Sequence, residues 1–197
     1  MCDFDKISRL IIGAQAAYLV SLGIVAAAVI LGSNPFTSGA NIPAMVIASA
    51  SAATAALLMA GAIAELDKCA SGPCGPSVAT LRTNLVALAA SIGIFSVSLA
   101  ALALVAGVPF AGSVAAGALA IWAVSLTSLF AAVASGYLGN AVQAFNSCLS
   151  ASGSGNTGTT TVIVVLGVLT ILLTVVFNAF GTASGVIPVK SILTIFG

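Results

Sequence analysis

Charged residues are scarce in this chain, and histidine is missing altogether. Only 5% of the 197 residues are charged, five Lys or Arg against four Asp or Glu, whereas 60% are hydrophobic. A soluble domain is typically about 25% charged, so nine charged groups cannot cover the surface of a soluble protein of this size. The hydrophobic content excludes intrinsic disorder, and the net charge of +1 gives no basis for nucleic-acid binding. The remaining class is an integral membrane protein.

The lack of histidine also limits the chemistry that the chain can perform. Histidine-ligated haem, imidazole-based zinc or copper sites, a His general base and a Ser-His-Asp triad all need an imidazole. No Walker-type or dinucleotide-binding glycine motif occurs either. The sequence therefore indicates no catalytic residue and no cofactor motif, and it favours a protein that is not an enzyme.

Five apolar stretches are long enough to cross a bilayer, which takes about 20 residues. They cover about 10–32, 43–64, 85–107, 114–139 and 160–180, and none has a charged residue in its interior. A helix satisfies its own backbone hydrogen bonds in lipid, and the alternating pattern of barrel strands is absent. The sequence thus predicts one all-α membrane domain over 1–197, with five transmembrane helices and short loops. The fourth helix is expected to leave the bilayer and continue as a wet helix through Gln143.

The first two hairpins, 8–71 and 82–150, resemble each other. Pro35-Phe36 and Pro109-Phe110 follow the first helix of each hairpin, and a Cys-x-Ser triplet follows the second, at Cys69 and at Cys148. A tandem hairpin repeat is one interpretation. The alternative is that alanine-rich hairpins look alike because of their composition.

Small residues dominate the second and fourth spans, whereas the fifth span is bulky and β-branched. Small residues allow helices to approach closely in lipid. We therefore expect the first four spans to form the core, with the fifth as a peripheral, lipid-facing helix. The small-residue faces also predict packing against copies of the same chain or against other membrane subunits.

The spans contain neutral polar side chains but no ionisable ones, which argues against proton relays and voltage sensors. An alternative function is therefore a small channel or transporter for a neutral solute. The side chains that would line its path are Gln15, Ser21, Ser49, Ser51, Thr54, Ser91, Ser96, Ser98, Ser125, Thr127 and Ser128. The simpler explanation is that the hydroxyls bond to backbone carbonyls of their own or the next helix.

The charged residues are distributed unequally between the two sides of the predicted membrane domain. Five spans place Asp3, Asp5, Lys6, Arg9, Glu65, Asp67, Lys68 and Arg82 on the side of the N-terminus, and Lys190 alone on the other. Lys and Arg therefore divide four to one. The positive-inside rule then predicts a cytoplasmic N-terminus and an outer C-terminus, in a bacterial inner membrane or a plasma membrane.

All four cysteines, Cys2, Cys69, Cys74 and Cys148, fall on that same side. Two disulfides are one interpretation, for example Cys69 with Cys74 and Cys2 with Cys148, although four cysteines allow three pairings. Disulfides need an oxidising compartment, which conflicts with a cytoplasmic location. Four thiolates that bind zinc or an iron–sulfur cluster fit a reducing cytoplasm. Thiol–disulfide exchange and four unrelated thiols are the remaining alternatives.

These observations favour a non-enzymatic structural or assembly subunit of a membrane complex or homo-oligomer. A neutral-solute channel and a metal-binding or thiol-redox protein are the alternatives. The face that carries the cysteines and eight of the nine charges is the expected location of any partner or chemistry.

Overall fold

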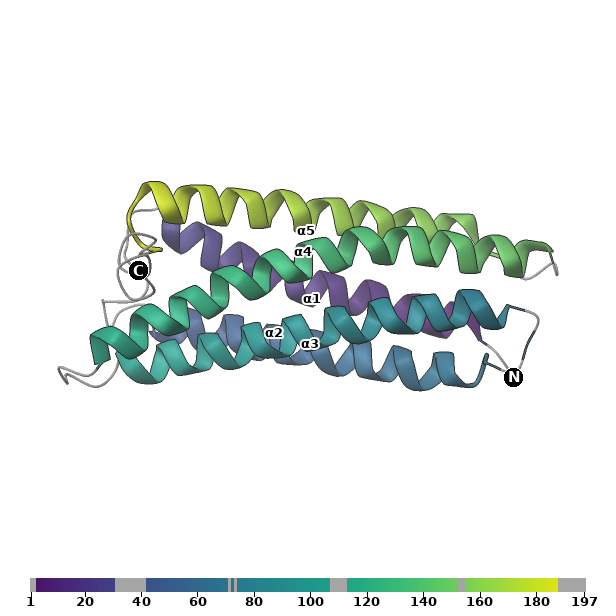
Figure 1. Cartoon of the computed structure of the whole chain (residues 1–197), viewed down its shortest axis with the longest axis horizontal. Helices are drawn as coiled ribbons and strands as arrows, with labels where there is room; N and C mark the ends of the chain where they lie inside the picture. Colours follow the sequence, from purple (N-terminus) through teal and green to yellow (C-terminus); the bar gives the residue numbers. More distant parts are fainter. Residues whose placement is uncertain are drawn as a thin grey trace, which may run out of the picture.

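The computed structural model describes residues 3–30, 42–70, 72, 74–106, 113–151 and 155–187. These form five helices: α1 (Phe4–Ile30), α2 (Ile42–Asp67), α3 (Gly75–Ala106), α4 (Ser113–Ala151) and α5 (Thr157–Ala183) (Figure 1). All five are long and apolar enough to cross a membrane. The predicted all-α membrane fold with five spans is therefore confirmed.

The helices run past their apolar stretches at one end of the bundle. One end of each helix lies there, at the right of Figure 1: the starts of α1, α3 and α5 and the ends of α2 and α4. We call this end of the bundle the polar end. The 39 residues of α4 span about 58 Å at 1.5 Å each, against about 30 Å for the hydrocarbon layer. Asn140 and Gln143 are exposed on this extension. The expected continuation of the fourth helix through Gln143 is confirmed.

Local sequence explains where α5 begins. The Asn156 side chain caps the helix by accepting from the backbone N–H groups of Gly158 and Thr159, which have no partner within the helix. The backbone N–H of Asn156 in turn donates to Oδ1 of Asn146 at 2.8 Å, in the last turns of α4. Two asparagines therefore join the start of α5 to the last turns of α4.

The five helices form a closed ring. Each helix packs against its neighbours in sequence, and α5 also packs against α1. Successive helices run in opposite directions, so that α1 and α5, at the two ends of the series, run parallel (Figure 1). This arrangement refines the expected packing. The bulky side chains of α5, such as Val165, Leu172 and Val175, do face outward, but the helix completes the ring rather than lying outside a four-helix core.

Aromatic rings and small residues fill the inside of the ring. Tyr18 of α1 meets Phe95 of α3 edge to face at 5.4 Å between centroids, and Phe4 meets Phe145 of α4 at 5.7 Å. The inward face of α2 has the small, fully buried residues Ala48, Ala52, Ala55 and Ala62. Much of the small-residue surface that the sequence shows therefore serves packing within the chain.

Serine hydroxyls join α2 to both of its neighbours. Ser21 donates to the carbonyl of Ala48 and Ser51 to that of Ala17, both at 2.7 Å. Ser49 and Ser96 donate to each other's carbonyls at 2.9 and 2.8 Å. Such bonds need close backbones, which small residues permit, and each contributes about 0.6 kcal/mol in a membrane protein.

The repeat hypothesis stays a prediction. Its Pro-Phe pairs at 35–36 and 109–110 lie outside the described residues, as does the tail from 188 to 197 with Lys190. The two cysteines that would correspond occupy different positions. Cys69 follows the end of α2, whereas Cys148 lies within the last turn of α4.

Candidate functional site

The polar end gathers the charged groups of the described chain. The eight charged residues that the structure describes, Asp3, Asp5, Lys6, Arg9, Glu65, Asp67, Lys68 and Arg82, all lie there. They come from α1, α2, the turn after α2, and α3. The polar end is therefore the first place to look for chemistry, as the sequence indicates.

Glu65 joins α1 to the end of α2. Lys6 Nζ donates to Glu65 Oε1 at 2.6 Å, and Lys68 Nζ donates to Oε2 at 2.7 Å. The side chain is only 17% exposed, and it lies just beyond the apolar stretch 43–64. Hydrogen bonds from Lys6 and Lys68 lower the pKa of Glu65 to about 2. The bond to Glu65 raises the pKa of Lys6 above its usual range.

A second ion pair joins the end of α2 to α3. Arg82 Nε donates to Asp67 Oδ1 at 2.8 Å, and both side chains are about half exposed. Exposed pairs of this kind add little stability. This pair nevertheless sets the position of the end of α2 relative to the start of α3.

A disulfide joins Cys74, before the first turn of α3, to Cys148 at the end of α4. Their Cα atoms are 6.0 Å apart, and they are 74 residues apart in sequence. Pro76 in the first turn of α3 costs no hydrogen bond, so the helix starts directly after the cysteine. Closing a loop of this length stabilises a soluble chain by up to about 4 kcal/mol in the loop-entropy model. The bond therefore holds the extended ends of α3 and α4 together outside the apolar layer.

The bond between Cys74 and Cys148 shows that both halves of the example pairing, Cys69 with Cys74 and Cys2 with Cys148, are wrong. Cys69 lies in a turn after α2, where its N–H donates to the carbonyl of Leu66 at 2.8 Å, while Cys74 faces the end of α4. Cys69 is buried and is itself disulfide-bonded. The remaining cysteine of the sequence, Cys2, lies outside the described residues.

The four-thiolate hypothesis is not tested by this arrangement. A disulfide offers no thiolate, so Cys74 and Cys148 could ligate zinc or an iron–sulfur cluster only after reduction. Within the described ranges, no group of three or more His, Cys, Asp or Glu side chains could hold a metal ion. A metal site therefore stays a prediction, and it applies to the protein with its cysteines reduced. Its ligands would be Cys2, Cys69, Cys74 and Cys148.

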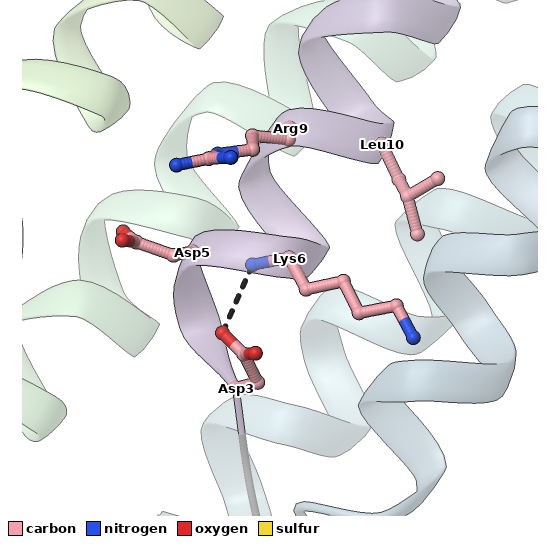
Figure 2. Close-up of a pocket in the computed structure, with 5 residues that line it drawn as sticks. All are labelled: Asp3, Asp5, Lys6, Arg9 and Leu10. Atoms are coloured by element: carbon pink, nitrogen blue, oxygen red, sulfur yellow. Dashed lines mark hydrogen bonds between the residues drawn. The ribbon is translucent and has the colours of Figure 1, made fainter.

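An open cleft of about 520 Å³ lies along the first turns of α1. It is lined by Asp3, Asp5, Lys6, Arg9 and Leu10 (Figure 2). Asp3 caps the helix, because its carboxylate accepts the backbone N–H of Lys6 at 3.0 Å. Asp5 and Arg9 point to the opposite side from Lys6 and Leu10. Neither forms an ion pair within the described part of the chain.

The side chains proposed for a solute path are almost all engaged elsewhere. Four of them make the bonds between α2 and its neighbours, and Ser125 donates to Asn178 Oδ1 at 2.5 Å. Five more hydroxyls donate to backbone carbonyls three or four residues earlier in their own helices: Thr54, Ser91, Ser98, Thr127 and Ser128. Gln15 is the one member of the set whose buried side chain has no partner among the described residues.

Several interior polar residues lie outside the set that the sequence suggests, and three of them bear on the packing of the bundle. Asn178 of α5 bonds to both Ser125 and Ser128, and the buried side chains of Tyr18 and Thr174 lack partners among the described residues. Asn178 was the most detectable of the three, because it is the one asparagine inside the five apolar stretches. Nothing in the sequence distinguishes Thr174 from the hydroxyls that bond within their own helix.

Comparison with known proteins does not supply a family. No family model matches the chain, and no curated protein or solved structure matches it.

The Cys74–Cys148 bond is expected to stabilise the bundle. The Cys74→Ser/Cys148→Ser double variant should unfold several degrees below the wild type in detergent, because the ends of α3 and α4 lose their covalent link. Thermal unfolding followed by circular dichroism measures the shift. A non-reducing peptide map should recover Cys74 linked to Cys148. Recovery of Cys69 linked to Cys74 would contradict the described pairing.

The Glu65 cluster should make stability depend on pH. A carboxylate whose pKa is lowered on folding stabilises the fold above its unfolded pKa, about 4.3, and loses this effect as the pH falls toward its folded pKa of about 2. Glu65→Gln should therefore lower Tm by a few degrees above about pH 5, and this difference should shrink between about pH 5 and pH 2. Asp67→Asn, at the more exposed pair, is the matched control and should shift Tm less. An unchanged Tm difference across this range would show that the Glu65 charge is not responsible.

Proposed function

We propose that this protein is a non-enzymatic structural or assembly subunit that associates with copies of itself in the membrane. The observation that carries this proposal is the outer face of α2. Ala50, Ala53, Leu57, Ala60 and Ala64 are all exposed on it, and their spacing alternates between three and four residues. This is the spacing of the contact positions of a helix that packs along a second helix.

Val46 and Ile47 are exposed near the start of α2, but over residues 50–64 its outer face differs from those of α4 and α5. Leu119, Phe130 and Val133 stand out from α4, and Leu172 and Val175 from α5. Exposing bulky apolar side chains to lipid costs no free energy, because lipid tails are as apolar as the side chains. On α2, Leu57 is 74% exposed between small neighbours, so a second helix could come close and receive it. A second copy offers the same surface and makes a self-complementary contact.

A larger side chain on this face should separate the copies. We expect Ala60→Leu to shift the wild-type oligomer toward the monomer, because the added bulk keeps the backbones apart. Light scattering of the full chain in mild detergent measures the mass. Ala179→Leu, at an exposed position of α5, is the matched control and should leave the mass unchanged.

Cross-linking in native membranes gives a second test of the same contact. Leu57→Cys should form an intermolecular disulfide on mild oxidation more readily than Val97→Cys, which is 70% exposed on α3. A monomeric wild type with equal cross-linking at both positions would refute self-association. Migration of the wild type with other proteins alone would favour a subunit of a mixed complex.

The same proposal needs an orientation in the membrane, for which two signals disagree. The four-to-one division of Lys and Arg favours a cytoplasmic polar end. The described disulfide favours an oxidising compartment at that end, because cytosolic thiols are kept reduced. The charge bias rests on five residues, and four carboxylates accompany the four cations. We therefore propose that the polar end lies outside the cytoplasm, as at the outer face of a bacterial inner membrane or a plasma membrane.

Lysine labelling of intact cells tests this orientation without any mutation. A membrane-impermeant amine reagent should modify Lys68, whose side chain is 55% exposed at the polar end, before the cells are opened. Lys190 should react only after permeabilisation. The reverse pattern would restore the orientation that the positive-inside rule predicts.

A further inference from the structure

Four polar atoms inside the bundle have no hydrogen-bond partner among the described residues. They are Nε2 and Oε1 of Gln15, the hydroxyl of Tyr18 and Oγ1 of Thr174. Gln15 and Tyr18 are each 1% exposed, and Thr174 is fully buried. Buried polar groups in proteins are nearly always hydrogen-bonded, and each exception needs an explanation.

The four atoms belong to two helices that pack side by side and run in parallel. Gln15 and Tyr18 are three residues apart, so they share one face of α1. A Cβ atom placed on Gly167 of α5 would come 3.8 Å from Gln15 Nε2 and 3.1 Å from the carbonyl oxygen of Ser135 in α4. Thr174 lies two turns further along the same buried face of α5. Gln15 therefore lies where α1 meets α5, and we call this contact the seam; the ring of Tyr18 packs against Phe95 of α3.

The seam lies deep in the apolar layer. Gln15 is six residues beyond Arg9, the last charged residue of α1, which corresponds to about 9 Å along the helix. Tyr18 is about 4.5 Å deeper, close to the middle of a hydrocarbon layer about 30 Å thick. Neither bulk water nor lipid headgroups can supply hydrogen bonds at this depth.

The chemistry of the side chains selects the kind of ligand. The Gln15 amide presents a donor and an acceptor, and the two hydroxyls can each do both. The described parts of the spans contain no charged side chain at this level to balance an ion. A neutral molecule that donates and accepts at once is therefore the complementary partner.

We propose that the buried side-chain amide of Gln15 binds water where α1 packs against α5. Because position 167 is glycine, the backbone of α5 comes close to Nε2 of Gln15 and to the carbonyl oxygen of Ser135 in α4. This site does not depend on the proposed self-association, because its residues face the inside of the ring.

The composition of the chain makes the test direct. Gln15 and Gln143 are the only glutamines in the sequence, so glutamine labelled with ¹⁵N in its side chain gives two pairs of amide signals in the full-length protein. Gln143 is exposed on the extension of α4, and Gln143→Asn assigns its pair without disturbing the core. The labelled protein is studied in nanodiscs or micelles by water-selective NOE and ROE spectra.

Bound water gives Gln15 amide cross-peaks of opposite sign in the NOE and ROE spectra, as expected for a residence time longer than molecular tumbling. The exposed Gln143 pair should show only exchange cross-peaks, which have the same sign in both spectra. The proposal is overturned if the Gln15 pair shows no dipolar cross-peak with water while its own amide signals are resolved. In that case Gln15→Leu should raise Tm, because it removes an unpaired polar group from a dry core.

Discussion

The structure depends on one constraint, which is that polar groups carried into lipid need a partner inside the protein. Ser21 and Ser51 meet it by bonding to carbonyls across the α1–α2 interface, and Ser49 and Ser96 do so across the next. Asn178 meets it through two serines of α4. These bonds form only where the backbones of two helices are close. Small residues allow that approach, so the same packing explains both the bonds and the abundance of small residues.

Closing the ring extends this constraint to α5. The bulky side chains of α5 lie on its outer face, whereas Gly167 on its inner face approaches both α4 and α1. Thr174 is buried on the same face. A peripheral helix could leave these residues unused. Their burial explains why α5 packs between its two neighbours, and the same tight approach brings the Gln15 amide next to the backbone of α5.

The sequence was sufficient for the helices and insufficient for their contacts. Length and hydropathy predict five spans, because the bilayer fixes both quantities. The disulfide partner of Cys74 depends on a different property, the height at which each helix ends. The stretch after Cys74 is polar enough to look like a loop, yet α3 begins at Gly75 and α4 continues to Ala151. These helix ends place Cys74 next to Cys148. The spacing of the cysteines in the sequence does not predict this contact. The orphaned hydroxyl of Thr174 was equally hidden, since whether a hydroxyl finds a partner depends on its neighbours in space.

The polar end shows how two general rules can disagree in one molecule, and why they do not have equal weight here. The positive-inside rule is statistical, and it gains force from many cations in short loops. Here it rests on four cations, of which Lys6, Lys68 and Arg82 are already paired with carboxylates. A disulfide is a chemical requirement, because it persists only where the surroundings do not reduce it. The disulfide also links the ends of α3 and α4. These ends reach past the apolar layer, where no lipid surrounds them. The outward-facing polar end that we propose would preserve the covalent bond, whereas a reducing cytoplasm would leave the long extensions of α3 and α4 without it.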